Sequence, residues 1–161
     1  MTETEVPEGP AVDAGETART IAQKLLDAGR LDAKAILVSQ DEDSIDLALE
    51  GPDAPALIGK QGATLNAVQY LVGLMLARAI HQRLRVSVDA ESYRARRAET
   101  LIKMATDLAI QVREHNQEAV MDPLNASERR IVHTALVEEP GISTYSEGEE
   151  PDRCVVISPK A

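Results

Sequence analysis

Apolar and polar positions divide the chain into two blocks of short helices and strands. In the first block, helical spacing gives way to strands near residues 45–49 and 84–88, where apolar side chains occupy every second position. The predicted elements are a helix from residue 16 to a stop at Gly29, strands at 35–38, 45–49 and 84–88, a helical turn at 54–58 and a helix at 63–79. The last helix is strongly apolar, with an inward side predicted to hold Leu65, Val68, Val72, Met75 and Leu76.

The second block begins with a long helix over residues 91–114, which carries one apolar stripe. A short strand is predicted at 117–123. Asn125 and Glu128 have the spacing of a capping box, so a helix is predicted from there to the stop at Pro140-Gly141. The remaining strands, at 142–146 and 153–157, are predicted to form a hairpin.

The order of these elements predicts an α+β fold with two small three-stranded-sheet domains joined by a long bridging helix. Residues 15–90 form the first domain, with the order αββααβ. Residues 91–161 form the second domain, which includes the bridging helix over 91–114. Residues 1–14 are acidic and contain Pro and Gly, which predicts a disordered leader.

The net charge of −10 is unevenly distributed along the chain. Residues 1–50 carry a net −8 and residues 136–161 a net −4, whereas residues 51–135 carry +2. Because phosphate binding requires local positive potential and not a basic chain, a nucleic-acid surface is expected in the middle segment. The chain has no Phe, no Trp and three Tyr, so base stacking on aromatic rings is expected to contribute little.

The cysteine content and the N-terminus predict a cytoplasmic protein. Cys154 is the single cysteine and lies in an apolar stretch, which predicts a buried thiol in a strand. The N-terminal residues lack the basic and apolar regions of a signal peptide. No apolar run approaches the roughly 20 residues that span a bilayer, so no integral membrane segment is expected.

The segment Gly59-Lys60-Gln61-Gly62 separates the two helical segments of the first domain and has the features of a phosphate clamp. Its glycines allow a sharp turn and a close ligand backbone, and the following helix offers the positive end of its dipole. Lys60 adds a mobile charge, and Ile58 adds apolar surface for bases. A bare Gly-x-x-Gly more often marks a plain turn between helices, so the surrounding elements must decide between these interpretations.

Arginines and a histidine supply the other candidate contacts. Arg129 and His133 are four residues apart and share one face of a predicted helix, with Arg130 beside them. Such a pair is usually solvated surface. A basic cluster at the start of the long helix is either a solvated face or a candidate phosphate track between the domains; it consists of Arg94, Arg96 and Arg97. The sequence shows no metal-ligand cluster and no evident catalytic arrangement, so we expect no catalytic residue, no metal and no cofactor.

Two longer strings resemble known domains. The string Leu57-Ile58-Gly59-Lys60-Gln61-Gly62, within the αββααβ order, resembles the type II KH domain, which grips about four nucleotides of single strand with this loop. The string Ser127-Glu128-Arg129-Arg130-Ile131-Val132-His133 is similar to the R-three-H domain, named for its Arg-x-x-x-His spacing. A KH domain followed by an R-three-H domain resembles the Jag family, also called SpoIIIJ-associated proteins.

The resemblance implies binding of single-stranded RNA, with single-stranded DNA as the alternative ligand. The implied contacts are Ile58, Gly59, Lys60, Gln61, Gly62, Arg129, Arg130 and His133. The family resemblance also implies a post-transcriptional or RNA-chaperone role in cell-envelope growth and pairing with a second small KH protein. The sequence departs from many members in lacking an extra N-terminal Jag domain, and in having Asn125-Ala126 where Ser-Pro is usual.

Two other functions compete with RNA binding. The main one is a protein-interaction scaffold that pairs with another small KH protein or with itself, with RNA binding secondary. An enzyme acting on nucleic acid is the other, although no paired carboxylates stand out. We therefore expect a non-enzymatic protein.

Overall fold

The computed structural model describes residues 12–160, which divide into two compact units between Arg94 and Ala95. Most of the predicted leader lies outside the described residues. The first helix, α1, spans Ala14–Ala28 and is capped by Asp13, whose side chain accepts from the N–H groups of Gly15 and Glu16. The helix therefore begins two residues earlier than the apolar spacing predicts, because a side-chain cap fixes its start.

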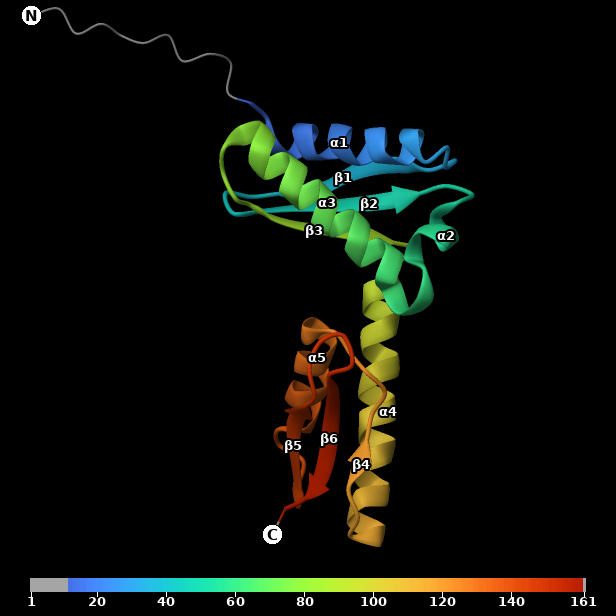
Figure 1. The fold of residues 1–161 in the computed structure, drawn as a ribbon, viewed down its shortest axis with the longest axis vertical. Helices are drawn as coiled ribbons and strands as arrows, with labels where there is room; N and C mark the ends of the chain where they lie inside the picture. Colours follow the sequence, from blue (N-terminus) through green and yellow to red (C-terminus); the bar gives the residue numbers. More distant parts are fainter. Residues whose placement is uncertain (1–11, 161) are drawn as a thin grey trace, which may run out of the picture. The chain divides into compact units, whose positions relative to one another are not determined.

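The first unit is a three-stranded sheet with helices on one face (Figure 1). After α1 come β1 (Lys34–Gln40) and β2 (Ser44–Glu50), which pair antiparallel, and then α2 (Ala54–Ile58). A short 3₁₀ turn η1 (Lys60–Gly62) leads into α3 (Ala63–Ile80), and β3 (Arg85–Ala90) pairs parallel with β2. This parallel pair needs a crossover, which α2, η1 and α3 supply. The αββααβ order is confirmed.

The core of the first unit is aliphatic. The alternation predicted for β2 is confirmed, since Ile45, Leu47 and Leu49 are buried in the core while the residues between them are only half-buried. In α3, Leu65, Val72 and Leu76 are fully buried, whereas the inward position predicted for Met75 is wrong because that side chain is exposed. A helix 18 residues long needs only one stripe against a small sheet, so the rest of its apolar surface stays outside.

The segment Lys60–Ile80 is long and apolar enough to cross a membrane by length and composition, with a mean hydropathy of 1.3. The expectation that no apolar run approaches this length is therefore wrong. A core helix meets the same test, and here α3 contributes Leu65, Val72 and Leu76 to the core of the first unit.

The second unit packs two helices against a second three-stranded sheet. Helix α4 (Tyr93–His115) begins in the first unit and continues into the second, followed by β4 (Ala119–Val120) and α5 (Ala126–Leu136). Strands β5 (Ile142–Glu147) and β6 (Cys154–Pro159) complete the sheet, in the order β4-β6-β5. The predicted hairpin and the two-sheet α+β fold are confirmed, although the strand expected over 117–123 is only two residues long.

Of two local predictions for the second unit, the capping box is confirmed and the buried cysteine is not. The capping box is confirmed: Asn125 accepts from the N–H of Glu128, whose carboxylate accepts from the N–H of Asn125. Cys154 does lie in a strand, but it is the first residue of β6 and only half-buried, so the prediction of a buried thiol is wrong. The apolar stretch that follows it, Val155–Ile157, enters the core instead.

Candidate nucleic-acid interface

The loop between α2 and α3 has a backbone that strongly favours glycine at its two ends. Gly59 has φ 69° and ψ −169°, and Gly62 has φ 77°, both in the region that side chains disfavour. A Cβ on Gly59 would lie 2.2 Å from Oγ1 of Thr64, and one on Gly62 would lie 2.7 Å from Cε1 of Tyr93. The glycines therefore let the loop fold tightly against its own unit.

This tight loop presents its two middle residues to solvent. Lys60 and Gln61 are exposed, and Gln61 itself has φ 53°. No side chain caps the start of α3, and the first turn carries no acidic residue. The exposed lysine therefore lies beside the positive end of an 18-residue helix, an arrangement that favours an anion.

Ile58 is the apolar residue near the loop that a base can contact. It is half-buried at the end of α2, so part of its side chain stays accessible. Leu65, near the start of α3, is fully buried in the core and is not available to a base.

A groove of about 490 Å³ lies beside α3 in the same unit. Its lining combines α3 side chains, including Asn66 and Tyr70, with Arg83 and Leu84 from the turn before β3. Tyr70 is 69% exposed, so its ring is an available stacking surface. Sequence reasoning missed Tyr70 and Arg83. A tyrosine on an otherwise aliphatic helix was the available signal for the first, and nothing in the sequence marked the second.

The side chain of Arg94 is hydrogen-bonded to the edge strand β3 and to α3. Its Nε donates to the carbonyl of Val88 (2.9 Å), and its Nη atoms donate to Oδ1 of Asn66 (3.0 Å) and Oε1 of Gln69 (2.9 Å). The same Gln69 oxygen accepts from the N–H of Val88 at 3.0 Å. The donors of Arg94 are thus used to hold α3 against β3, which leaves little capacity for phosphate.

The other arginines of the candidate phosphate track differ in their surroundings. Arg97 donates from Nε to Oε1 of Glu128 at 2.9 Å, and both side chains are largely buried. Arg96 is exposed on α4. A track over all three residues stays a prediction that the contacts of Arg94 and Arg97 do not favour.

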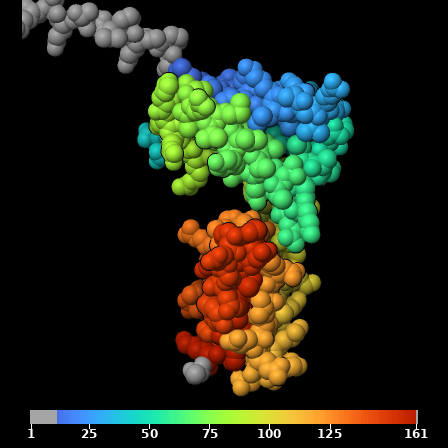
Figure 2. Space-filling model, viewed as in Figure 1, coloured from blue at the N-terminus to red at the C-terminus, as the bar shows by residue number. Residues whose placement is uncertain are grey.

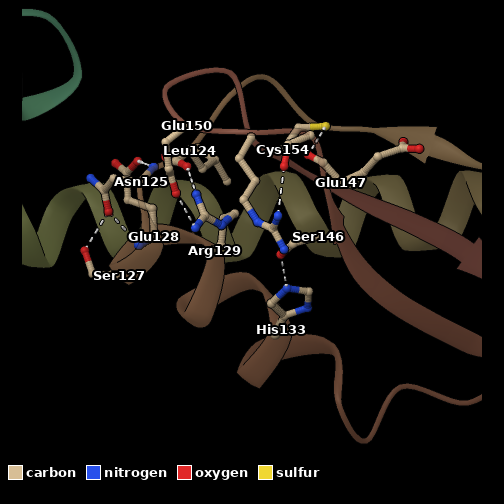
Figure 3. Close-up of polar contacts among 12 residues, drawn as sticks. Leu124, Asn125, Ser127, Glu128, Arg129, His133, Ser146, Glu147, Glu150 and Cys154 are labelled. Carbon is tan, nitrogen blue, oxygen red and sulfur yellow. Dashed lines mark hydrogen bonds and ion pairs between the residues drawn. The ribbon is translucent and has the colours of Figure 1, made fainter.

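Arg129 and His133 are held inside the second unit (Figure 3). Arg129 is 8% exposed; its Nη1 donates to the carbonyl of Leu124 and its Nη2 to Oε1 of Glu150, each at 2.6 Å. His133 hydrogen-bonds Oγ1 of Thr144 through Nδ1 (2.7 Å) and Oγ of Ser146 through Nε2 (2.9 Å). Both residues therefore fasten α5 to its neighbours.

The surroundings of His133, Arg129 among them, favour its neutral form. Burial and, to a smaller extent, the positive charge of Arg129 lower the pKa of His133 below its ordinary value. A neutral imidazole suits this position, because one ring nitrogen can donate to a hydroxyl while the other accepts. Arg130, the next residue on α5, is exposed and has no side-chain partner within residues 12–160.

Comparison with known proteins agrees with this two-part architecture. The family described as KhpA/KhpB, KH domain, matches residues 16–88, and the R-three-H domain family matches residues 99–159. A protein of Bacillus subtilis (strain 168), RNA-binding protein KhpB, is 40% identical over 144 residues, which are 88% of this chain and 67% of that protein. This chain belongs to the KhpB family, also called the Jag family. The predicted KH and R-three-H domains and their order are confirmed.

Other KhpB relatives match over shorter parts of their length. RNA-binding protein KhpB of Clostridium symbiosum is 41% identical over 122 residues, which are 76% of this chain and 55% of that protein. The protein of the same name in Streptococcus pneumoniae serotype 2 is 34% identical over 114 residues, or 71% of this chain and 35% of that protein. The chain thus spans between about a third and two thirds of the relatives that it matches.

Proposed function

We propose that this chain binds single-stranded RNA, with the Gly59–Gly62 loop as the main grip on the phosphate backbone. The observation that carries the proposal is the loop itself: two glycines where any other side chain would be strained, exposed Lys60 and Gln61, and an uncapped helix start behind them. The relatives are named RNA-binding proteins, which supports the same ligand and not a catalytic role.

The neighbouring groove extends this grip toward the bases. A strand whose phosphates lie on the loop can place bases against Ile58 and the ring of Tyr70, while Arg83 meets a further phosphate. With Tyr70 as the stacking surface, most of the affinity would come from phosphate contacts, so binding should weaken as salt rises.

The loop is tested by changing Lys60 and Gln61 together to Asp and measuring the affinity of the full chain for fluorescent single-stranded RNA by anisotropy. The expected result is at least a tenfold loss, because one favourable charge becomes two repulsive ones beside phosphate. The matched control changes Lys103 and Gln111, both exposed on α4, to Asp. Equal affinities for the two double variants would show that the loop is not the binding site.

We propose the finer cellular role from the family resemblance: post-transcriptional control or RNA chaperoning in the cytoplasm, linked to cell-envelope growth. Sequencing of RNA crosslinked to the chain in cells tests this role. Enrichment of transcripts for envelope and division proteins is expected. A uniform sampling of all cellular RNA would contradict the regulatory part of the proposal while leaving RNA binding intact.

A protein-pairing function is the second candidate, because α3 carries an exposed apolar row. In the space-filling view, α3 covers much of the visible face of the first unit (Figure 2). The row consists of Tyr70, Leu71, Leu74 and Met75, each at least 39% exposed. Exposed apolar rows of this kind mark protein contacts more often than isolated apolar residues do.

This second function can be separated from RNA binding with two residues that do not line the groove. Leu71 and Met75 are changed together to Glu, and the mass of the chain is measured by light scattering, alone and with a second small KH protein. Loss of the complex with unchanged RNA affinity would support pairing through α3. Unchanged assembly would exclude this row as the contact.

A further inference from the structure

The second unit contains a groove of about 400 Å³ between α4 and α5. Its apolar lining comes from Ala98 and Ile102 on α4 and from Ile131 and Ala135 on α5. Its exposed polar members are Ser127, Arg130 and Thr134, all on α5. A site of this size lies in the range of pockets that hold small ligands.

Arg130 and Thr134 are the available polar groups of α5. They are four residues apart and therefore share one helix face, one position along from Arg129 and His133. Among the residues that the structure describes, neither side chain has a hydrogen-bond or ion-pair partner, whereas Arg129 and His133 each make two side-chain hydrogen bonds.

The charge of the groove is unbalanced. Arg130 is the charged residue in its lining, and no acidic side chain lines it within residues 12–160. Ser127, at the same groove, already donates its hydroxyl hydrogen to Oδ1 of Asn125. The groove therefore offers an apolar surface, one unneutralised guanidinium and one free hydroxyl.

We propose that this groove binds one nucleotide of the single strand, with the base against Ile102 and Ile131 and the phosphate on Arg130. The planar guanidinium matches phosphate with two parallel hydrogen bonds, and the Thr134 hydroxyl can donate to or accept from a base edge. This inference rests on the proposed RNA-binding function and adds a second contact site to it. Linking two weak sites in one chain raises the overall affinity.

Isoleucine methyl groups report on the two sites separately. The full chain, labelled at its Ile δ1 methyl groups, is titrated with a short single-stranded oligoribonucleotide of random sequence and followed by NMR. Ile58 reports on the loop, and Ile102 and Ile131 report on the groove. Ile110 lies exposed on the same α4 but outside the groove, so its methyl signal is expected to stay in place.

A charge-reversal pair tests the role of Arg130. In Arg130→Glu, the shifts of Ile102 and Ile131 should disappear and the affinity should fall about tenfold, while the shift of Ile58 persists. Lys103→Glu changes the net charge equally on an exposed position of α4 and should leave both sets of shifts intact.

The outcomes separate this proposal from the RNA-binding function. Shifts at Ile58 without shifts at Ile102 and Ile131 would overturn the groove and leave RNA binding standing. Absence of all three shifts would overturn both. Equal effects of the two charge reversals would remove Arg130 from the site. Shifts of Ile102 and Ile131 on addition of a protein partner, and not of RNA, would make the groove a protein-docking site and overturn the proposal.

Discussion

Replacing Arg129 with Met should destabilise the second unit and leave the RNA contacts nearly unchanged. The methionine keeps the apolar stem of the side chain but removes two hydrogen bonds. The bond to the buried carbonyl of Leu124 contributes about 1.5–3 kcal/mol, because the donor is charged and the carbonyl is left without its partner. Glu150 is 59% exposed, so its ion pair adds only about 0–1 kcal/mol.

The expected loss in the free energy of unfolding is therefore about 1.5–4 kcal/mol. In a unit of this size such a loss lowers the melting temperature by roughly 6–30 °C. Urea unfolding followed by circular dichroism, with amide exchange of α5 to locate the effect, measures the change. RNA affinity is then measured well below the transition, where the variant is folded.

Arg130→Met is the matched comparison, since it removes the same side chain from the adjacent, exposed position. Its stability should stay within about 0.5 kcal/mol of the parent, as is usual for surface changes, and its RNA affinity should fall. A stable Arg129→Met variant that has lost RNA binding would refute the structural role of Arg129 derived above. So would an Arg130→Met variant that is destabilised as strongly as Arg129→Met.

Three further predictions follow from individual contacts. Gly59→Ala should lower the free energy of unfolding of the first unit by about 1–3 kcal/mol, because its backbone conformation is nearly restricted to glycine. Gly73 lies inside α3, where an added Cβ meets nothing within 4 Å, so Gly73→Ala should raise the free energy of unfolding by about 0.5–1 kcal/mol in the same urea titration. Arg94→Met should lower the stability of the first unit without changing the slope of RNA affinity against salt, because the donors of this arginine are already bonded within the unit. A shallower slope would show that Arg94 contacts a phosphate. The pKa of His133 lies below the ordinary 6.5 in the folded chain, so the unfolded chain binds this proton more readily. The stability of the protein should therefore fall as pH drops from about 7.5 through 6.5, and His133→Gln should show a weaker pH dependence of unfolding. Identical pH profiles for the parent and the variant would contradict the lowered pKa of His133.

The periodic signals predicted most of the fold because they reflect burial directly. The alternation in β2 and the capping box at Asn125 each depend on a few neighbouring residues, and both are confirmed. The errors arise where long-range packing decides. Met75 matches the helical spacing but faces solvent, because the small sheet covers only one stripe of α3, and the two-residue β4 is limited by its pairing with β6.

The loop could be predicted from its sequence, but the groove beside it could not. Gly59 and Gly62 mark the loop in the sequence because a sharp turn with positive φ favours glycine, and both residues do have positive φ. Arg83 reaches the groove only because the parallel pairing of β3 with β2 places the preceding turn beside α3. Arg94 and Arg97 read as a basic surface cluster in the sequence, whereas the structure gives each of them an intramolecular acceptor.

The burial of Arg129 could have been predicted from the spacing of its own helix. Val132 and Leu136 are core residues, and Arg129 lies three and seven positions before them, which places it on the same inward face. A charged residue on that face must find partners or incur a large desolvation cost, and the carbonyl of Leu124 and the carboxylate of Glu150 meet this need. Arg130 lies one position farther along, about 100° around the helix, where water is available and no partner is required. The same helical geometry that makes the Arg-x-x-x-His pair structural therefore leaves the neighbouring Arg130 and Thr134 as the pair that a nucleic-acid strand can reach.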